Sequence, residues 1–373
     1  MIYHLTRATR HLFFWSLIVL AIALSAMRFL LASIEVYKED LESRLSTELA
    51  APVKISSLGA GIHAFRPALV LNNIQVLSAE AAASPVIRIK EVRVSLDLLR
   101  ALGDSAALAS ARVTLIGAEL SVKRYRDGHI AILGVQSTND QPPFWLLQGE
   151  RYEFLQSRVL WQDEMVDANA HQSLAHLDQL FQDVNVLLQN SVDGKHVINM
   201  MLKLPARYGE ALIASMQLRG NFLAANGLNG LIYVKGKRLN LESIPADLLP
   251  LGLKLNRGHL DAQLWGYWQH SALQAMTGNT QVQDLDLQRA NHPDLLLNNF
   301  SWRFNALHVE NGWQMKADHL MLHGEQLQLL DARLALAFHE QPTLTLSGFT
   351  LKAQQLDLQQ FVRAMLSAWR LVS

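Results

Sequence analysis

The chain has 373 residues, of which 50% are hydrophobic, and it carries 33 Lys and Arg against 33 Asp and Glu. Its length suffices for one to three domains with cores of their own. The balanced charge forms no long block of one sign, which excludes the electrostatic footprint of a nucleic-acid-binding protein. The absence of cysteine excludes disulfides, thiolate metal sites and cysteine nucleophiles. Charged residues make up 18%, below the usual ~25%, so much of the surface is uncharged.

Residues 12–34 are the one stretch that is long and apolar enough to cross a bilayer. These 23 residues rise ~1.5 Å each and give a helix of ~34 Å, against a hydrocarbon core of ~30 Å. Arg28 lies near the far end, where its stem reaches the headgroups. Arg7 and Arg10 precede the span, which favours a cytoplasmic N-terminus. The alternative is a cleavable signal peptide with a site at residues 21–23. Both interpretations place the rest of the chain outside the cytosol.

The predicted membrane helix continues as an amphipathic stalk. Tyr37, Leu41, Leu45 and Leu49 recur at every fourth position among charged neighbours, which puts them on one face of a helix. Pro52 ends this pattern. We therefore predict a membrane anchor and stalk helix over residues 1–50.

From Val53 onward, apolar residues alternate with polar or small ones, which is the period of half-buried strands. The alternation changes parity near Lys90 and Glu91, as one inserted residue would cause, and again across Gly117, so we predict a bulge and a kink there. Three dipeptides of the tight-turn type fall between alternating runs, which predicts hairpins and a meander; they are Asp127-Gly128, Asp193-Gly194 and Asn311-Gly312. A long antiparallel sheet of about fifteen strands, ~70 Å long at ~4.8 Å per strand, is predicted over residues 51–356.

Three short interruptions of the strand pattern read as helix or loop, at residues 142–147, 171–180 and 243–251. The C-terminal residues 357–373 carry an apolar stripe behind Asp357, which is a suitable N-cap. We predict an amphipathic helix there, packed on the sheet or, alternatively, lying on a membrane surface.

No pattern of a catalytic or metal site emerges. His319 and His323 would flank one metal on a helix, but their segment is predicted to be a strand, in which four residues span ~13 Å. Gly230, Gly236 and Lys237 resemble a phosphate-binding loop, but the spacing between the two glycines is one residue longer than that motif has. The aromatic cluster Trp265, Tyr267 and Trp268 fits a core or a rim role. We expect no enzyme activity, no cofactor and no metal.

Several motifs resemble one known family. APVKISSL at 51–58 and PALVLNNI at 67–74, directly behind one N-terminal membrane helix, resemble the start of AsmA-like envelope proteins. Later motifs resemble the YhdP branch of that family: DGH at 127–129 leading into ILG at 132–134, VLWQD at 159–163, GYW at 266–268 and NGW at 311–313. These are strand and turn signatures, and they cover the whole chain in order. Members of the branch are several times longer, so the chain resembles an N-terminal portion or a truncated product.

The resemblance implies a bridge-like lipid-transfer protein. The expected fold is mainly β: a transmembrane helix, then an elongated, twisted antiparallel sheet curled into an apolar groove, with a few short helices. The expected role is to shelter the acyl chains of membrane phospholipids on that groove, with the anchor in the inner membrane and the bulk in the periplasm, for transport towards the outer membrane. Envelope proteins at the distal end are possible partners, and nucleic acid is not. Candidate groove residues are Ile198, Met200, Leu202, Leu204, Leu212, Met216 and Leu218.

One alternative of a different class stays open at this stage. A membrane-tethered structural or assembly factor for outer-membrane proteins would show the same alternation without transporting lipid, because every ordinary antiparallel sheet alternates. The two hypotheses differ in whether the apolar positions line an open trough or meet a second layer of protein.

Overall fold

The computed structural model describes residues 11, 13–18, 21–22, 34–63, 66–78, 85–95, 110–125, 127, 129–133, 149–164, 179–191, 193–220, 227–244, 254–270, 272–289, 292–324, 328–340 and 345–353. Strands dominate this part of the chain, as the alternation predicted. The predicted C-terminal helix at 357–373 and the interruption at 142–147 lie outside it. Of the predicted membrane span, residues 13–18 and 21–22 are described, and both pieces are helical. No helix in the described ranges is both long and apolar enough to span a membrane.

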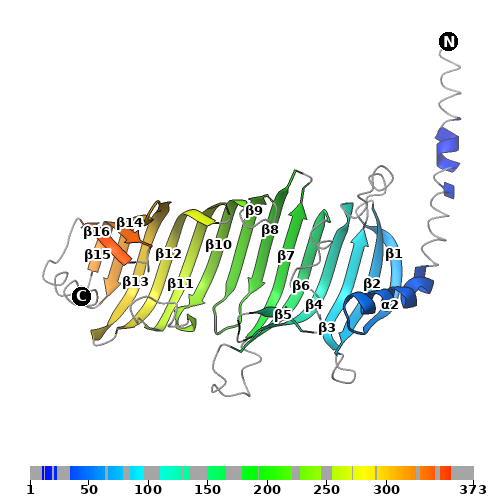
Figure 1. Cartoon of the computed structure of the whole chain (residues 1–373), viewed down its shortest axis with the longest axis horizontal. Helices are drawn as coiled ribbons and strands as arrows, with labels where there is room; N and C mark the ends of the chain where they lie inside the picture. The colour runs from blue at the N-terminus through cyan, green and yellow to red at the C-terminus, as the bar shows by residue number, and fades with distance from the viewer. Residues whose placement is uncertain are drawn as a thin grey trace, which may run out of the picture. The chain divides into compact units, whose positions relative to one another are not determined.

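From Ile34 onward, the described elements are three short helical elements and sixteen strands (Figure 1). The helical elements are η1 (Ile34–Tyr37), α2 (Lys38–Glu48) and η4 (Leu241–Ser243). The strands are β1 (Val53–His63), β2 (Arg66–Leu77), β3 (Pro85–Ser95), β4 (Arg112–Arg124), β5 (Ile130–Ile132), β6 (Arg151–Asp163), β7 (Leu180–Asn190), β8 (Lys195–Lys203), β9 (Ala211–Arg219), β10 (Asn229–Asn240), β11 (Lys254–Gln269), β12 (Ala272–Arg289), β13 (His292–Val309), β14 (Gly312–Gly324), β15 (Gln328–His339) and β16 (Thr345–Lys352).

The sixteen described strands belong to one sheet whose order follows the sequence, β1-β2-β3-β4-β6 and then β7 to β16, while β5 pairs with β4. This is the predicted meander. Two of the predicted tight turns are confirmed: Asp193-Gly194 joins β7 to β8 with Gly194 at φ 71°, and Asn311-Gly312 joins β13 to β14. The third turn lies between β4 and β5, and its Gly128 is outside the described residues.

The chain divides into two compact units. The first unit comprises residues 1–123 and 129–155, and the second unit comprises residues 124–128 and 156–373. Each is described separately below.

In the first unit, α2 lies on the sheet and completes a hydrophobic core (Figure 1). Leu41, Leu45 and Leu49 pack against a buried cluster formed by Ala51, Val53, Ile55, Leu58, Leu71, Ile74, Val76 and Ile87. The predicted amphipathic stripe is therefore confirmed at three of its positions. Tyr37 was wrongly assigned to it, because this residue falls in η1 and is 64% exposed. The helix also rests against β1 and does not stand free as a stalk, since burying three leucines is more favourable than leaving them in water.

Side chains of η1 and α2 also accept hydrogen bonds from backbone N–H groups at the outer edge of β1, the first strand of the sheet. The backbone N–H of Ile55 donates to Glu42 Oε1 at 2.7 Å, and that of Leu58 donates to Glu35 Oε2 at 2.7 Å. The N–H of Val53 donates to Ser46 Oγ at 2.9 Å. An unpaired edge strand exposes a row of such donors and is a template for unwanted pairing. The helical segment therefore closes this edge of the sheet.

The predicted change of parity in β3 is shared by three neighbouring strands. Asn73 in β2 and Gly117 in β4 have φ of 49° and 63°, and both adjoin Lys90 in β3. Ile89 and Val92, on either side of Lys90, pack against the same core cluster, so the side chains do change face there. The predicted single inserted residue is not present, because the pairing of β2, β3 and β4 continues without a shift through this row. Gly117 fits because a Cβ there would lie 3.1 Å from Lys90 Cβ.

A half-buried carboxylate joins two strands of the first unit. Glu150 Oε2 accepts a hydrogen bond from Arg66 at the start of β2 at 3.2 Å, and Oε1 accepts one from Arg112 at the start of β4 at 2.6 Å. Burial raises the pKa of Glu150, but the hydrogen bonds and charges of Arg112 and Arg66 outweigh burial, so that the pKa lies below its ordinary value. The carboxylate is therefore charged at neutral pH.

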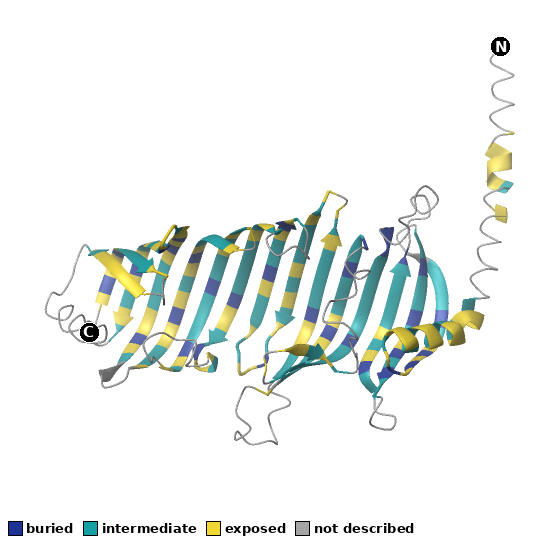
Figure 2. Cartoon of the chain, viewed as in Figure 1, coloured by how far each residue is buried: buried dark blue, intermediate teal, exposed yellow. Residues whose placement is uncertain are grey.

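In the second unit, β7 to β16 continue the meander, and more shielded residues alternate with exposed ones along several of these strands, such as β8 and β14 (Figure 2). Non-glycine residues with positive φ interrupt several strands, and side chains support them. Arg238 in β10 has φ 44°, and its N–H donates to Asp261 Oδ1 at 2.8 Å. His319 and Asp331 have φ of 50° and 47° on the paired strands β14 and β15, and their side chains meet at 2.9 Å. Such irregularities bend strands and increase their twist.

Candidate functional site

The predicted groove residues lie together on one face of two paired strands in the second unit. Cross-strand pairing of β8 and β9 places Ile198 opposite Met216 and Leu202 opposite Leu212. Met200 lies between these pairs, opposite a buried alanine. Leu218 follows on the same face of β9, and Leu204 lies just after β8, with its N–H donating to Glu210 O at 3.0 Å. The strand pattern alone therefore located neighbouring positions on one face.

The row of apolar residues continues across the other strands of the second unit. The pairing of each strand with the next carries it from β7 to β16, and we call this surface the apolar face. Besides the β8 and β9 residues, its large members include Val186, Leu188, Ile232, Val234, Leu260, Leu264, Met276, Val282, Phe300, Trp302, Phe304, Met315, Leu320, Leu334, Leu336 and Leu351. On β13, Phe300, Trp302 and Phe304 form a ladder with ring centroids 5.3 and 5.4 Å apart.

The reverse side of the same strands, which we call the polar face, is far more polar. It carries Lys235, Gln263, Asn279, Arg303 and Lys316 on five successive strands. Its apolar side chains are exposed, with Met201 at 51% and Leu231 at 59%. Trp265 and Tyr267 also lie on this face, with 41% and 43% exposure.

The predicted aromatic cluster is therefore divided between the two faces. Trp265 packs at 5.3 Å between ring centroids against Tyr233 on the polar face, whereas Trp268 pairs with Leu273 on the apolar side. A core or rim role for the three residues together was predicted, but the alternation of the strand separates them.

No second layer of protein from the described ranges covers the apolar face. The strands of the second unit make extensive contacts with their sheet neighbours, and the further element that contacts them is η4, which lies against β11. In the described part of the chain, the apolar positions therefore do not meet a second layer of protein. Among the described residues, the neighbours of these hydrocarbon-like side chains are mainly other residues of the sheet.

Small residues on the apolar face help to explain why its large side chains are buried or half-buried although no described element covers them. Gly278 lies between Leu264 and Phe304 on the paired strands, and a Cβ there would come within 2.6 Å of Leu264 Cδ2 and 2.9 Å of Phe304 Cε1. Ala262 and Ala317 take similar positions and are buried under their neighbours. These small residues therefore leave room on the apolar face for the large side chains of the neighbouring strands. Sequence reasoning missed this feature, although alternating Ala and Gly at apolar positions are its signal.

The described residues hold no group of three or more metal-type ligands. His319 and His323 both lie on β14, as predicted for that segment, and His319 is engaged with Asp331. At the start of β9, Glu210 pairs with Lys237 at 2.7 Å. The hydrogen bond from Lys237 lowers the pKa of Glu210, and the same bond raises the pKa of Lys237, so both are charged at neutral pH.

Comparison with known proteins agrees with the fold and with the sequence motifs. A family model described as YhdP protein matches residues 1–368. Neither curated proteins nor solved structures give a match. Because the match covers nearly the whole sequence, the chain is a member of the YhdP family.

Proposed function

We propose that the second unit shelters phospholipid acyl chains on its apolar face, as part of a bridge-like lipid-transfer protein. The proposal places the chain in the inner membrane through residues 12–34, with its bulk in the periplasm, and has it carry lipid towards the outer membrane. It is supported by the family membership and above all by an apolar face that no described element covers. The protein acts by binding, without a catalytic step.

The physical basis is the transfer of hydrocarbon from water to an apolar surface. Each buried methylene contributes ~0.8 kcal/mol, and this attraction needs no directional chemistry. A surface of aliphatic and aromatic side chains, such as the part formed by Leu264, Gly278 and Phe304, offers contact along its whole length. The headgroups stay in water at the ends of the strands, where the sheet presents polar residues.

Two adjacent methionines give a matched test. Met200 lies half-buried on the apolar face, and Met201 lies 51% exposed on the polar face. A photoreactive methionine analogue at each position, in full-length protein in native membranes, is irradiated and examined for crosslinked phospholipid by mass spectrometry. We expect crosslinks from position 200 and few from position 201. Equal crosslinking from both positions would contradict the proposal, since exposure alone would favour Met201.

Charge substitutions provide a second test with a control on the opposite face. Leu202→Asp places a carboxylate among apolar side chains and should remove co-purifying phospholipid, whereas Ile213→Asp, on the polar face, should not. Thermal unfolding of both variants separates loss of lipid from loss of fold. Wild-type protein that carries no phospholipid and instead captures unfolded β-barrel proteins would favour the alternative of a membrane-tethered assembly factor.

A further inference from the structure

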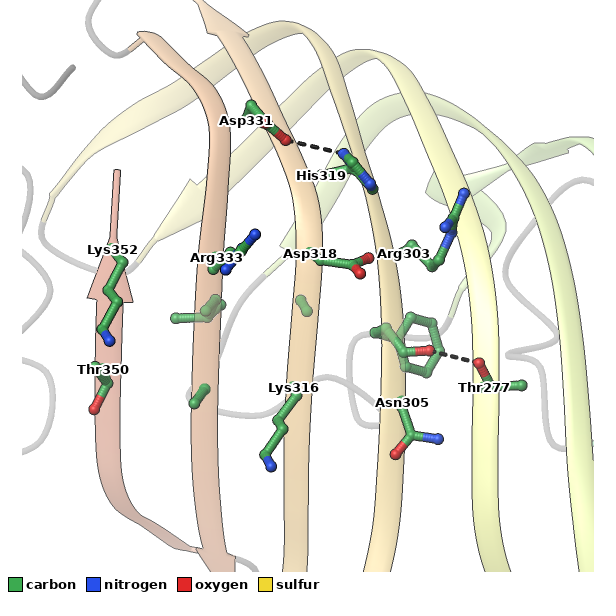
Figure 3. A pocket seen from close by; sticks show the side chains of 14 residues that line it. Thr277, Arg303, Asn305, Lys316, Asp318, His319, Asp331, Arg333, Thr350 and Lys352 are labelled. Atoms are coloured by element: carbon green, nitrogen blue, oxygen red, sulfur yellow. Dashed lines mark hydrogen bonds and ion pairs between the residues drawn. The ribbon is translucent and has the colours of Figure 1, made fainter. Parts of the chain in front are cut away.

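The polar face of the second unit contains a hollow that the lipid proposal does not use. It has a volume of about 600 Å³ and lies over β12 to β16. That volume is within the range of small-molecule sites, ~300–1,000 Å³. Figure 3 shows Arg303, Asp318, Arg333 and Lys352 side by side on four successive strands, with Lys316 and Thr350 next to them. All these side chains belong to the polar face.

Cations outnumber carboxylates in this hollow, and the cations form no ion pair with a described residue. Arg303, Lys316, Arg333 and Lys352 line it against two carboxylates, Asp318 and Asp331. Asp331 is engaged with His319 at 2.9 Å. Within the described residues, none of the four cations forms an ion pair within 4.0 Å. Elsewhere in the second unit, Arg219, Lys237 and Arg238 each have an acidic partner.

Two of the cations are placed against each other. Arg333 on β15 and Lys352 on β16 are direct cross-strand partners. Like charges directly opposite each other on paired strands are destabilising. An anion between them would remove the repulsion and accept hydrogen bonds from both. The guanidinium fork of an arginine matches the oxygens of a phosphate, and a lysine adds a point charge.

A polar atom in the same hollow also lacks a partner. Asp318 Oδ1 is buried and accepts no hydrogen bond from the described residues, although Arg303 is the cross-strand partner of Asp318. A buried acceptor without a donor costs free energy, and a ligand that carries a donor would satisfy it. The hollow thus offers cations on β15 and β16 and, on β14, a half-buried carboxylate with one unsatisfied oxygen.

We propose that this hollow binds a phosphate ester that carries an ammonium or hydroxyl group close to the phosphate. Arg333 and Lys352 hold the phosphate oxygens, Lys316 adds positive charge, and the half-buried Asp318 carboxylate accepts the hydrogen bond of the donor group. The shared chemistry fits a soluble phosphorylated amine or alcohol and the headgroup of a phospholipid. The site lies on the opposite side of the sheet from the apolar face, so it does not depend on the lipid-transfer proposal.

Calorimetric titration of the full chain in detergent tests the site with inorganic phosphate and with O-phosphoethanolamine, at constant ionic strength set with chloride. We expect both to bind, and O-phosphoethanolamine to bind more tightly. Arg333→Ala and Lys352→Ala should each weaken binding by about 10- to 100-fold, which is the loss of a charged hydrogen bond. Arg257→Ala, an exposed arginine on β11, is the matched control and should bind as the wild type does.

The role of Asp318 is tested by Asp318→Asn, which should abolish the preference for O-phosphoethanolamine over phosphate while phosphate still binds. A short-chain phosphatidylethanolamine then distinguishes the two sources. Equal affinity for it and for O-phosphoethanolamine identifies a soluble ligand, and a large gain from the acyl chains identifies a lipid headgroup. No binding by a folded wild type, or equal binding by Arg333→Ala and Arg257→Ala, would overturn the proposal.

Discussion

Glu150 connects the starts of β2 and β4 in the first unit, and its environment allows a residue-scale prediction. Its carboxylate accepts charged hydrogen bonds from Arg66 and Arg112. Glu150→Gln keeps the shape but removes the charge, and we expect it to lower the free energy of unfolding of the first unit by about 1–3 kcal/mol. Urea unfolding, monitored through the hydrogen exchange of backbone amides in β2 and β4, measures this change in free energy. The matched control is Glu48→Gln, an exposed position on α2 that should leave stability unchanged.

The same residue predicts how stability changes with pH. The arginines lower the pKa of Glu150 in the folded state relative to the unfolded chain. Its contribution is therefore fully present above the pKa of the unfolded residue, ~4.3, and is lost as the pH falls through the lower folded value. Wild-type protein should lose stability more steeply below about pH 5 than Glu150→Gln does. Parallel acid titration curves for the two proteins would show that the carboxylate contributes nothing.

At the scale of elements, the closed edge of β1 depends on three side chains of η1 and α2. Glu35, Glu42 and Ser46 accept the backbone N–H groups of Leu58, Ile55 and Val53. Replacing the three acceptors by alanine should leave α2 on the sheet, because Leu41, Leu45 and Leu49 remain buried. It should, however, expose the edge donors to water and to other strands.

Hydrogen exchange measures this effect directly. The amides of Val53, Ile55 and Leu58 should exchange much faster in the triple variant, while those that pair β1 with β2 keep their protection. Glu39→Ala combined with Glu48→Ala provides a control on exposed positions of the same helix. Unchanged protection at the three edge amides would mean that α2 shields the edge by packing alone.

Sequence patterns predicted the secondary-structure elements better than the contacts that residues make between strands. The period of two located the strands and placed Ile198, Met200 and Leu202 on one face, because side-chain direction in a strand follows from the backbone alone. The Asp-Gly and Asn-Gly turns followed from their backbone requirements. By contrast, the side chains change face at one row shared by Asn73, Lys90 and Gly117. This row depends on the register of three strands, which a short stretch of sequence does not reveal. The unpaired cations Arg333 and Lys352 meet for the same reason, through pairing across a hairpin.

The continuity of the apolar face across β7 to β16 leads to a prediction for the second unit as a whole. If the apolar face is a conduit, lipid must be able to move across every strand of it. If the face is a set of independent binding sites, no such movement is needed. Leu264→Asp on β11 should therefore stop lipid at that strand, because a carboxylate in the path of acyl chains requires desolvation or leaves a hydrated gap. Photoreactive methionine analogues at Met200 on β8 and Met315 on β14 report on the two sides of the barrier.

If lipid enters from the N-terminal side of the second unit, Leu264→Asp should abolish phospholipid crosslinks at position 315 and preserve them at position 200. The neighbouring Gln263→Asp introduces the same charge on the polar face and should preserve both. Loss at position 200 with retention at 315 would keep the conduit and reverse its direction. Retention at both positions in the folded Leu264→Asp protein would show that lipid reaches each strand independently from solution, and the apolar face would then be a set of binding sites and not a path.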